Sequence, residues 1–352
     1  MTSIKKITPS DRELLFLSWP IFVELFLRVV IGNINVWMIS HYSEPAVASI
    51  GAANQLLNLM VFVYGFITIG TQIIIAQYIG ANKLRDIKHV IHTALFGSFT
   101  IGMMISIVFF FFSKSLLTFM NLNEELIQIG NSYLQIFGGS LIISALSAVI
   151  IAILRTHGHT KPALLIPMTA SILSVIGNYF VLYQPFGLPS FGVSGLAYSS
   201  VFGNMIGLII SVALLKRYIG FSIFSFRFRK ISFPILKAIL MYGLPSSGET
   251  LSYQGAQVVV TIAKSYISAI TQFVYLIAAA LSQGNQIMVG RDVGAGEFER
   301  AYNRGMRTTI IGASASLIIC LITFIFIEPI MGIFTSNPEV IHIAKEVFLV
   351  EI

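Results

Sequence analysis

Hydrophobic residues run in long stretches along this chain, and short polar segments separate the stretches. About twenty consecutive apolar residues are enough for an α-helix to cross the hydrocarbon core of a bilayer. We therefore expect an all-α integral membrane protein. The predicted spans are residues 14–40, 46–79, 90–113, 126–153, 162–184, 193–216, 236–263, 271–293, 305–327 and 338–352.

The second half of the chain repeats a pattern of the first half. Residues 70–81 return as residues 284–295, 214 positions later, and each copy leads from an apolar stretch into a charged connection. Two similar halves imply a site between them. The equivalent positions singled out here are Gln72 with Gln286, and Gly80 with Gly294. We interpret the two glycines as helix ends, where backbone freedom is needed.

A second match fixes the starts of the two bundles. Pro20 and Glu24 match Pro245 and Glu249 at a separation of 225 positions. Because the later motif is separated by only 214 positions, the second half is shorter by about eleven residues after Ser265. We interpret the chain as lacking those residues and two further spans.

These matches predict the domain organisation. We expect an N-terminal six-helix bundle at residues 1–216, a cytoplasmic linker at 217–235 and an incomplete C-terminal bundle of four spans at 236–352. Six is an even number, so both bundles enter the membrane from the same side. Their predicted pseudo-two-fold axis then runs along the membrane normal.

Composition and charge agree with a multi-pass membrane protein. Hydrophobic residues make up 56% of the chain and charged residues only 11%, which is too little polar surface for a water-soluble globule. Most of the 22 Lys and Arg residues fall in the N-terminal tail and in every second connection. This distribution predicts a cytoplasmic N-terminus in the cell membrane, and it explains the net charge of +7 without nucleic-acid binding.

The chain has no motif of a nucleotide-driven pump or of an enzyme. A Gly-x4-Gly-Lys-Ser/Thr loop, which would cradle the phosphates of ATP, does not occur, and neither His-Glu-x-x-His nor Cys-x-x-Cys is present. We therefore expect no catalytic residues, no resident metal and no cofactor.

Several motifs resemble the multidrug and toxic compound extrusion (MATE) family in their order and spacing. They lie at residues 154–161, 177–195 and 282–301, with Pro20 and Pro245 at the repeat starts. The resemblance implies a twelve-span efflux transporter of bacterial type, whose two bundles form a V. It also implies antiport, in which H+ or Na+ drives amphipathic, often cationic, drugs or toxic compounds out of the cell. We expect a monomer in the bilayer.

Carboxylates inside the membrane are the first candidates for ion coupling. Glu24 lies four residues before Arg28, so it forms either a neutralised structural pair or part of the coupling site. Glu249 has no basic residue on its own helical face, which favours a functional role.

Two amides stand where the family resemblance leads us to expect cation sites. Asn35 takes the place of the family's first-span Asp, and Asn178 matches its fifth-span Asn but is followed by Leu182 instead of an Asp. The seventh-span Glu of another branch is replaced by Gly255. Amide oxygens can still coordinate Na+ or accept a hydrogen bond from a substrate, although they carry no proton.

Further amides lie in otherwise apolar spans, at related places in the two halves. They either bind the helices to one another or face the substrate path. These amides are Asn54, Asn58, Gln72, Gln283, Asn285 and Gln286.

Two alternatives to drug efflux remain open. A flippase of lipid-linked oligosaccharides would share the doubled fold, but its polyanionic cargo requires Arg and Lys in the cavity, where the spans offer only Arg28. A membrane sensor that does not transport is the other alternative, and a transport assay would distinguish it.

Overall fold

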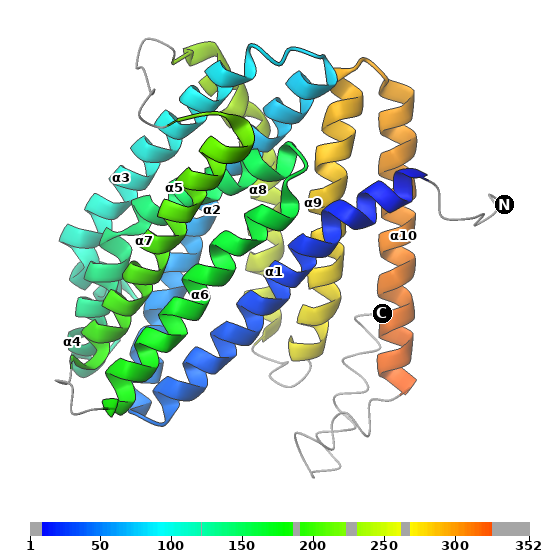
Figure 1. Ribbon diagram of the computed structural model, residues 1–352. Coiled ribbons are helices and arrows are strands. Elements are labelled where there is room, and N and C mark those ends of the chain that lie inside the picture. Colours follow the sequence, from blue (N-terminus) through cyan, green and yellow to red (C-terminus); the bar gives the residue numbers. More distant parts are fainter. Residues whose placement is uncertain (1–8, 121, 186–190, 223–230, 262–267, 326–352) are drawn as a thin grey trace. The chain divides into compact units, whose positions relative to one another are not determined.

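The computed structural model describes residues 9–120, 122–185, 191–222, 231–261 and 268–325 (Figure 1). Within these ranges the chain forms ten α-helices and a five-residue π-helical segment, η1. The predicted all-α architecture is confirmed. The helices are α1 (Pro9–Ser40), α2 (Glu44–Gly80), α3 (Ile87–Phe119), α4 (Glu124–Tyr133), η1 (Leu134–Gly138), α5 (Leu141–Thr156), α6 (Thr160–Tyr183), α7 (Gly192–Ile219), α8 (Phe233–Thr261), α9 (Ser268–Gly294) and α10 (Phe298–Ile325).

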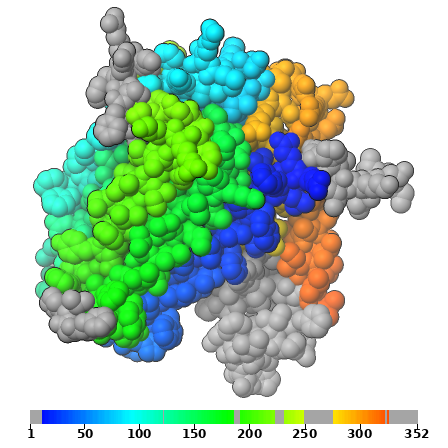
Figure 2. All heavy atoms as spheres, viewed as in Figure 1, coloured from blue at the N-terminus to red at the C-terminus, as the bar shows by residue number. Residues whose placement is uncertain are grey.

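Most of these helices have the length and hydropathy of membrane spans. Among the described residues, six helices pass this test alone, and α4 with η1 passes it together with α5, as a pair that is bent by 44°. Helices α8 and α9 coincide with the predicted spans 236–263 and 271–293, whereas the predicted span 338–352 lies outside the described residues. Figure 2 shows the outer face of α6 and α7, in green. Large apolar side chains are exposed on these helices, as on a lipid-facing surface, and they include Leu165, Ile172, Ile176, Tyr198, Phe202 and Ile209.

Helix boundaries follow local signals in the sequence. The Ser43 side chain caps α2 by accepting a hydrogen bond from the Ala46 amide at 3.4 Å, and Asn123 caps α4 in the same way. α2 ends at Gly80 and α9 ends at Gly294. The left-handed conformation lies two residues after these glycines, at Asn82 (φ 56°) and its repeat partner Gly296 (φ 78°). We expected the two glycines to need this conformational freedom, but the left-handed conformation is adopted two positions later in each turn.

The chain divides into two compact units, each described here by itself. Unit 1 comprises residues 1–26 and 248–352, and unit 2 comprises residues 27–247. The divisions fall inside α1 and α8, whereas the predicted bundles divide at the linker 217–235. In unit 1, the first turns of α1 pack through Leu14 and Leu17 on α9.

Unit 2 has two buried apolar clusters along its helices. One surrounds Phe109 of α3 and Leu134 of η1, and the other surrounds Ile75 of α2, Ile91 of α3 and Ile153 of α5. The first turns of α8 join the second cluster through Ile239. These clusters pack α2, α3 and α5 against one another, and they also include buried residues of α6 and α7, such as Ile166 and Leu215.

Candidate functional site

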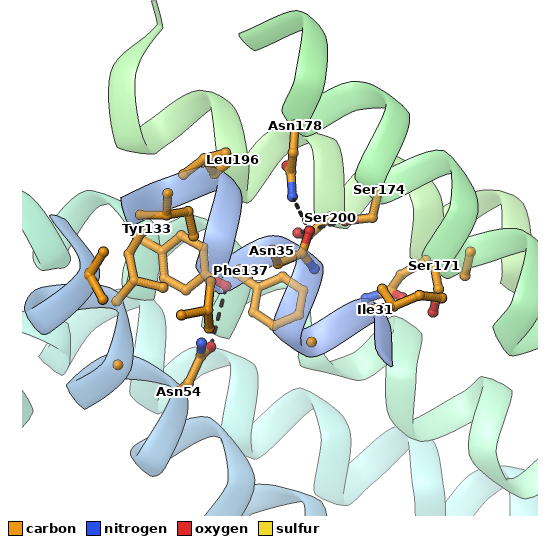
Figure 3. Close-up of a pocket in the computed structure, with 18 residues that line it drawn as sticks. Ile31, Asn35, Asn54, Tyr133, Phe137, Ser171, Ser174, Asn178, Leu196 and Ser200 are labelled. Atoms are coloured by element: carbon orange, nitrogen blue, oxygen red, sulfur yellow. Dashed lines mark hydrogen bonds between the residues drawn. The ribbon is translucent and has the colours of Figure 1, made fainter. Parts of the chain in front are cut away.

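A cavity of about 500 Å³ lies within unit 2, between α1, α2, α4, η1, α6 and α7 (Figure 3). It is amphipathic, because amide and hydroxyl groups share its wall with aliphatic and aromatic side chains. The polar lining residues are Asn35, Asn54, Tyr133, Ser171, Ser174, Asn178, Ser200 and Asn204. The larger apolar ones are Ile31, Val36, Ile39, Val47, Ile50, Phe137 and Leu196.

Asn35 of α1 and Asn178 of α6 meet in this cavity. The Asn178 Nδ2 donates a hydrogen bond to the Asn35 Oδ1 at 3.1 Å. Asn178 is only 4% exposed, and within the described part of the chain its Oδ1 has no hydrogen-bond partner. A buried acceptor of this kind is costly unless a ligand satisfies it. Two residues predicted separately from the sequence are therefore brought together, and one oxygen is left available.

A second polar group comes from the paired helices α6 and α7. The hydroxyls of Ser174 and Ser200 are hydrogen-bonded at 3.1 Å, and the Asn204 Nδ2 donates to the Ser144 Oγ of α5 at 3.3 Å. The helices can approach so closely because Gly203 has no side chain: a Cβ at this position would lie 2.4 Å from the Ala170 carbonyl oxygen. The close packing places both serines at the cavity wall.

The aromatic wall comes from the bend between α4 and α5. Tyr133 donates to the Asn54 Oδ1 at 3.3 Å, and its ring lies 5.8 Å, centroid to centroid, from that of Phe137. Phe137 belongs to the π-helical segment η1, whose extra residue per turn changes which face of the helix a side chain occupies. Both rings border the cavity as a result.

The cavity contains no charged side chain among the residues described as lining it. The acidic residues between positions 27 and 247 are Glu44, Asp86, Glu124 and Glu125. They lie at the starts of α2, α3 and α4, not in the interiors of the spans. Hydrogen bonding through neutral groups is therefore the polar chemistry that this cavity offers.

The other predicted site residues lie elsewhere. Glu24 is buried in α1, with 6% exposure, but does not line the cavity, and Glu249 lies in α8 with its side chain outside the described part of the structure. Asn285 of α9 accepts a hydrogen bond from the Thr308 hydroxyl of α10 at 3.0 Å, as a packing role requires. Gln72 is buried in α2, Gln283 and Gln286 are half-buried in α9, and Asn58 is exposed.

The sequence-based prediction missed the serines and the aromatic residues of the cavity. Ser171, Ser174 and Asn178 recur at positions i, i+3 and i+7 of one helix, and Ser200 and Asn204 recur at i and i+4 of the next. Such spacing places each set on one helical face. A search for polar stripes within the apolar spans could therefore have found this wall.

Comparison with known families identifies the class of protein. A family model described as MatE matches residues 20–180 and 257–352, which is more than half of the chain. The chain therefore belongs to the MATE family: it is a multi-pass membrane transporter and not an enzyme.

Individual relatives agree with this assignment. The chain is 33% identical to "Uncharacterized transporter YisQ" of Bacillus subtilis (strain 168), over 98% of this chain and 78% of the relative. It is 24% identical to "Probable multidrug resistance protein NorM" of Thermotoga maritima, over 95% of this chain and 74% of that protein. An outward-facing multidrug resistance MATE transporter of the MOP superfamily has the same fold, with a TM-score of 0.81 at 20% identity, over 98% of this chain and 80% of that one.

Proposed function

We propose that this transporter is a secondary antiporter that exports amphipathic compounds, often cationic ones, in exchange for H+ or Na+. The observation that carries the proposal is the cavity of unit 2, where hydrogen-bonding groups and apolar side chains face the same space inside membrane-spanning helices. Such a lining suits molecules with one apolar part and one polar part. The absence of an ATP-binding loop from the sequence supports an ion gradient as the energy source.

The cavity lining bears on the flippase alternative. A polyanionic headgroup requires Arg or Lys side chains, and none is present among the described residues that line the cavity. Small amphipathic compounds are therefore the favoured cargo.

The coupling ion is the second part of the proposal. In unit 2 the free Oδ1 of Asn178 is an oxygen that could coordinate Na+, whereas the cavity lining offers no carboxylate to carry a proton. If H+ is the coupling ion, we assign it to Glu249 or Glu24, whose carboxylates can exchange a proton within the membrane.

Reconstituted vesicles with imposed gradients test this proposal. Uptake of two compounds is measured under a pH gradient, a Na+ gradient or neither. The compounds are tetraphenylphosphonium, which is a lipophilic cation, and chloramphenicol, which is an uncharged amphiphile. At least one compound should accumulate with one gradient, and an ionophore that collapses the gradient should abolish the accumulation. Transport that persists without a gradient but stops when ATP is removed would refute antiport, and no transport of either compound would favour the sensor.

A further inference from the structure

The charge of the unit 2 cavity indicates which compounds it binds. Its polar lining consists of amides and hydroxyls, and no Asp or Glu occurs between residues 45 and 85 or between residues 126 and 247. These ranges include α5, α6, α7 and all of α2 except its first residue, Glu44, which is exposed and does not line the cavity. The parts of these helices that line the cavity therefore supply no carboxylate to a ligand.

Glu24 of α1 is not among the residues that line the cavity, the first of which is Ile31. An organic cation, which is too large for the close oxygen coordination that a Na+ ion can obtain from Asn178, would have to lose its water in this space without meeting an opposite charge, and this is costly inside a membrane protein.

An uncharged ligand finds suitable partners in the same place. The Asn178 Oδ1 is buried without a partner and can accept a hydrogen bond from a ligand hydroxyl or N–H group. The Ser174 and Ser200 hydroxyls, which lie beside it in Figure 3, can both donate and accept. Phe137 and Leu196 offer apolar surface to the rest of the ligand. The cavity volume of about 500 Å³ falls within the range of drug-sized sites.

We propose that this cavity is a binding site for uncharged amphipathic compounds that carry hydroxyl or amide groups beside an aromatic or aliphatic part. The inference rests on the proposed export function and specifies the substrate class for this one site. Cationic cargo, which the proposed function includes, then requires a carboxylate outside the cavity.

Equilibrium binding without any ion gradient tests the site separately from transport. The full chain in lipid nanodiscs is dialysed against labelled chloramphenicol, which is uncharged and carries hydroxyl, amide and aromatic groups, or against tetraphenylphosphonium. We expect chloramphenicol to bind more tightly. Asn178→Ala should weaken chloramphenicol binding by about tenfold, since one hydrogen bond to a buried acceptor is lost, and should leave tetraphenylphosphonium binding unchanged.

A substitution that adds charge reverses the preference. Asn35→Asp keeps the acceptor for the Asn178 Nδ2 and adds a negative charge to the cavity wall. It should strengthen tetraphenylphosphonium binding by at least about tenfold and weaken chloramphenicol binding. Asn131→Asp is the matched control, because Asn131 accepts a hydrogen bond from Ser113 at 2.7 Å and does not line the cavity.

The outcomes separate the inference from the proposed function. Tighter binding of the cation by the unaltered chain, no chloramphenicol binding at millimolar concentration, or equal responses to Asn35→Asp and Asn131→Asp would overturn the inference. Chloramphenicol binding with the expected responses, but no gradient-driven transport, would support the site and contradict the antiport function.

Discussion

Glu24 and Glu249 are matched residues of the two repeats, and the proposed proton coupling depends on them. Glu24 is buried in α1 and lies four residues before Arg28, a spacing that suits a structural ion pair. We expect Glu249→Gln to leave the protein inserted and folded but to abolish or uncouple transport. Glu24→Gln should mainly lower thermal stability, because the change leaves the Arg28 charge uncompensated.

Gradient-driven uptake and thermal unfolding, measured on the same preparations, distinguish these roles. Glu44→Gln is the control, since Glu44 is exposed in the first turn of α2. Normal transport by a well-expressed Glu249→Gln variant would rule out this assignment and move the coupling role to Glu24, Asn35 or Asn178.

A buried ion pair at the junction of α9 and α10 gives a prediction about stability. The Arg304 Nε lies 2.6 Å from the Asp292 Oδ2, and each side chain is 9% exposed. Removing one partner leaves a buried charge, so we expect Arg304→Met to lower the free energy of unfolding by about 3–5 kcal/mol. Denaturant unfolding in mild detergent measures the loss.

The control for this pair is its exposed neighbour. Arg300 lies 3.7 Å from the Asp292 Oδ1 but is 61% exposed, so Arg300→Gln should lower the unfolding free energy far less than Arg304→Met does. Similar losses from both variants would show that the burial of Arg304 does not determine its contribution.

At the scale of helices, the contact between α6 and α7 positions the polar wall of the cavity. A Cβ on Gly203 would lie 2.4 Å from the Ala170 carbonyl oxygen, so Gly203→Ala must push the helices apart. We expect a loss of about 1–3 kcal/mol in unfolding free energy, as in other overpacked sites, together with weaker ligand binding in the cavity. Thermal unfolding and equilibrium dialysis check the two effects.

Gly305→Ala in α10 is the matched control, because no atom lies within 4 Å of a Cβ at that position. There the better helix propensity of alanine should stabilise the protein by up to about 1 kcal/mol. A neutral Gly203→Ala change would mean that α6 and α7 can separate without strain.

The sequence predicts the helices better than it predicts the cavity. Apolar length alone indicates α2, α3, α6 and α7, because a bilayer requires spans of a narrow range of lengths. The single span predicted at 126–153 is instead broken by η1, since a π-helical turn leaves no clear signal in hydropathy. The faces of Tyr133 and Phe137 depend on that turn, so the aromatic wall could not be derived from helical periodicity.

The pair Asn35 and Asn178 shows the same limit at the site. Each amide could be selected because it is polar within an apolar span. Their hydrogen bond joins two residues that are 143 positions apart in the sequence. The Asn178 Oδ1 is left without a partner because of the way the neighbouring helices pack around this side chain. Neither fact is encoded in local spacing.

At the scale of the whole molecule, the sequence repeat corresponds to packing that is built twice. Gly70 of α2 lies against Ile239 of α8 in unit 2, and its repeat partner Gly284 of α9 lies against Ser18 of α1 in unit 1. Ser18 in turn matches Gly243, whose Cβ would lie 1.9 Å from the Phe66 carbonyl oxygen. In each unit, the first helix of one repeat therefore meets the second helix of the other repeat at small residues.

Joining one of these contacts covalently tests whether it separates during transport. A Cβ on Gly284 would lie 3.5 Å from the Ser18 Cβ, which is a suitable separation for a disulfide. We expect Ser18→Cys with Gly284→Cys, in a chain whose native Cys320 is replaced by Ser, to cross-link on oxidation and to lose gradient-driven uptake. Alternating access requires helices to move relative to one another, so reduction should restore transport. The single-cysteine variants, oxidised in parallel, control for damage by the oxidant. Full transport by completely cross-linked protein would show instead that α1 and α9 move as one body.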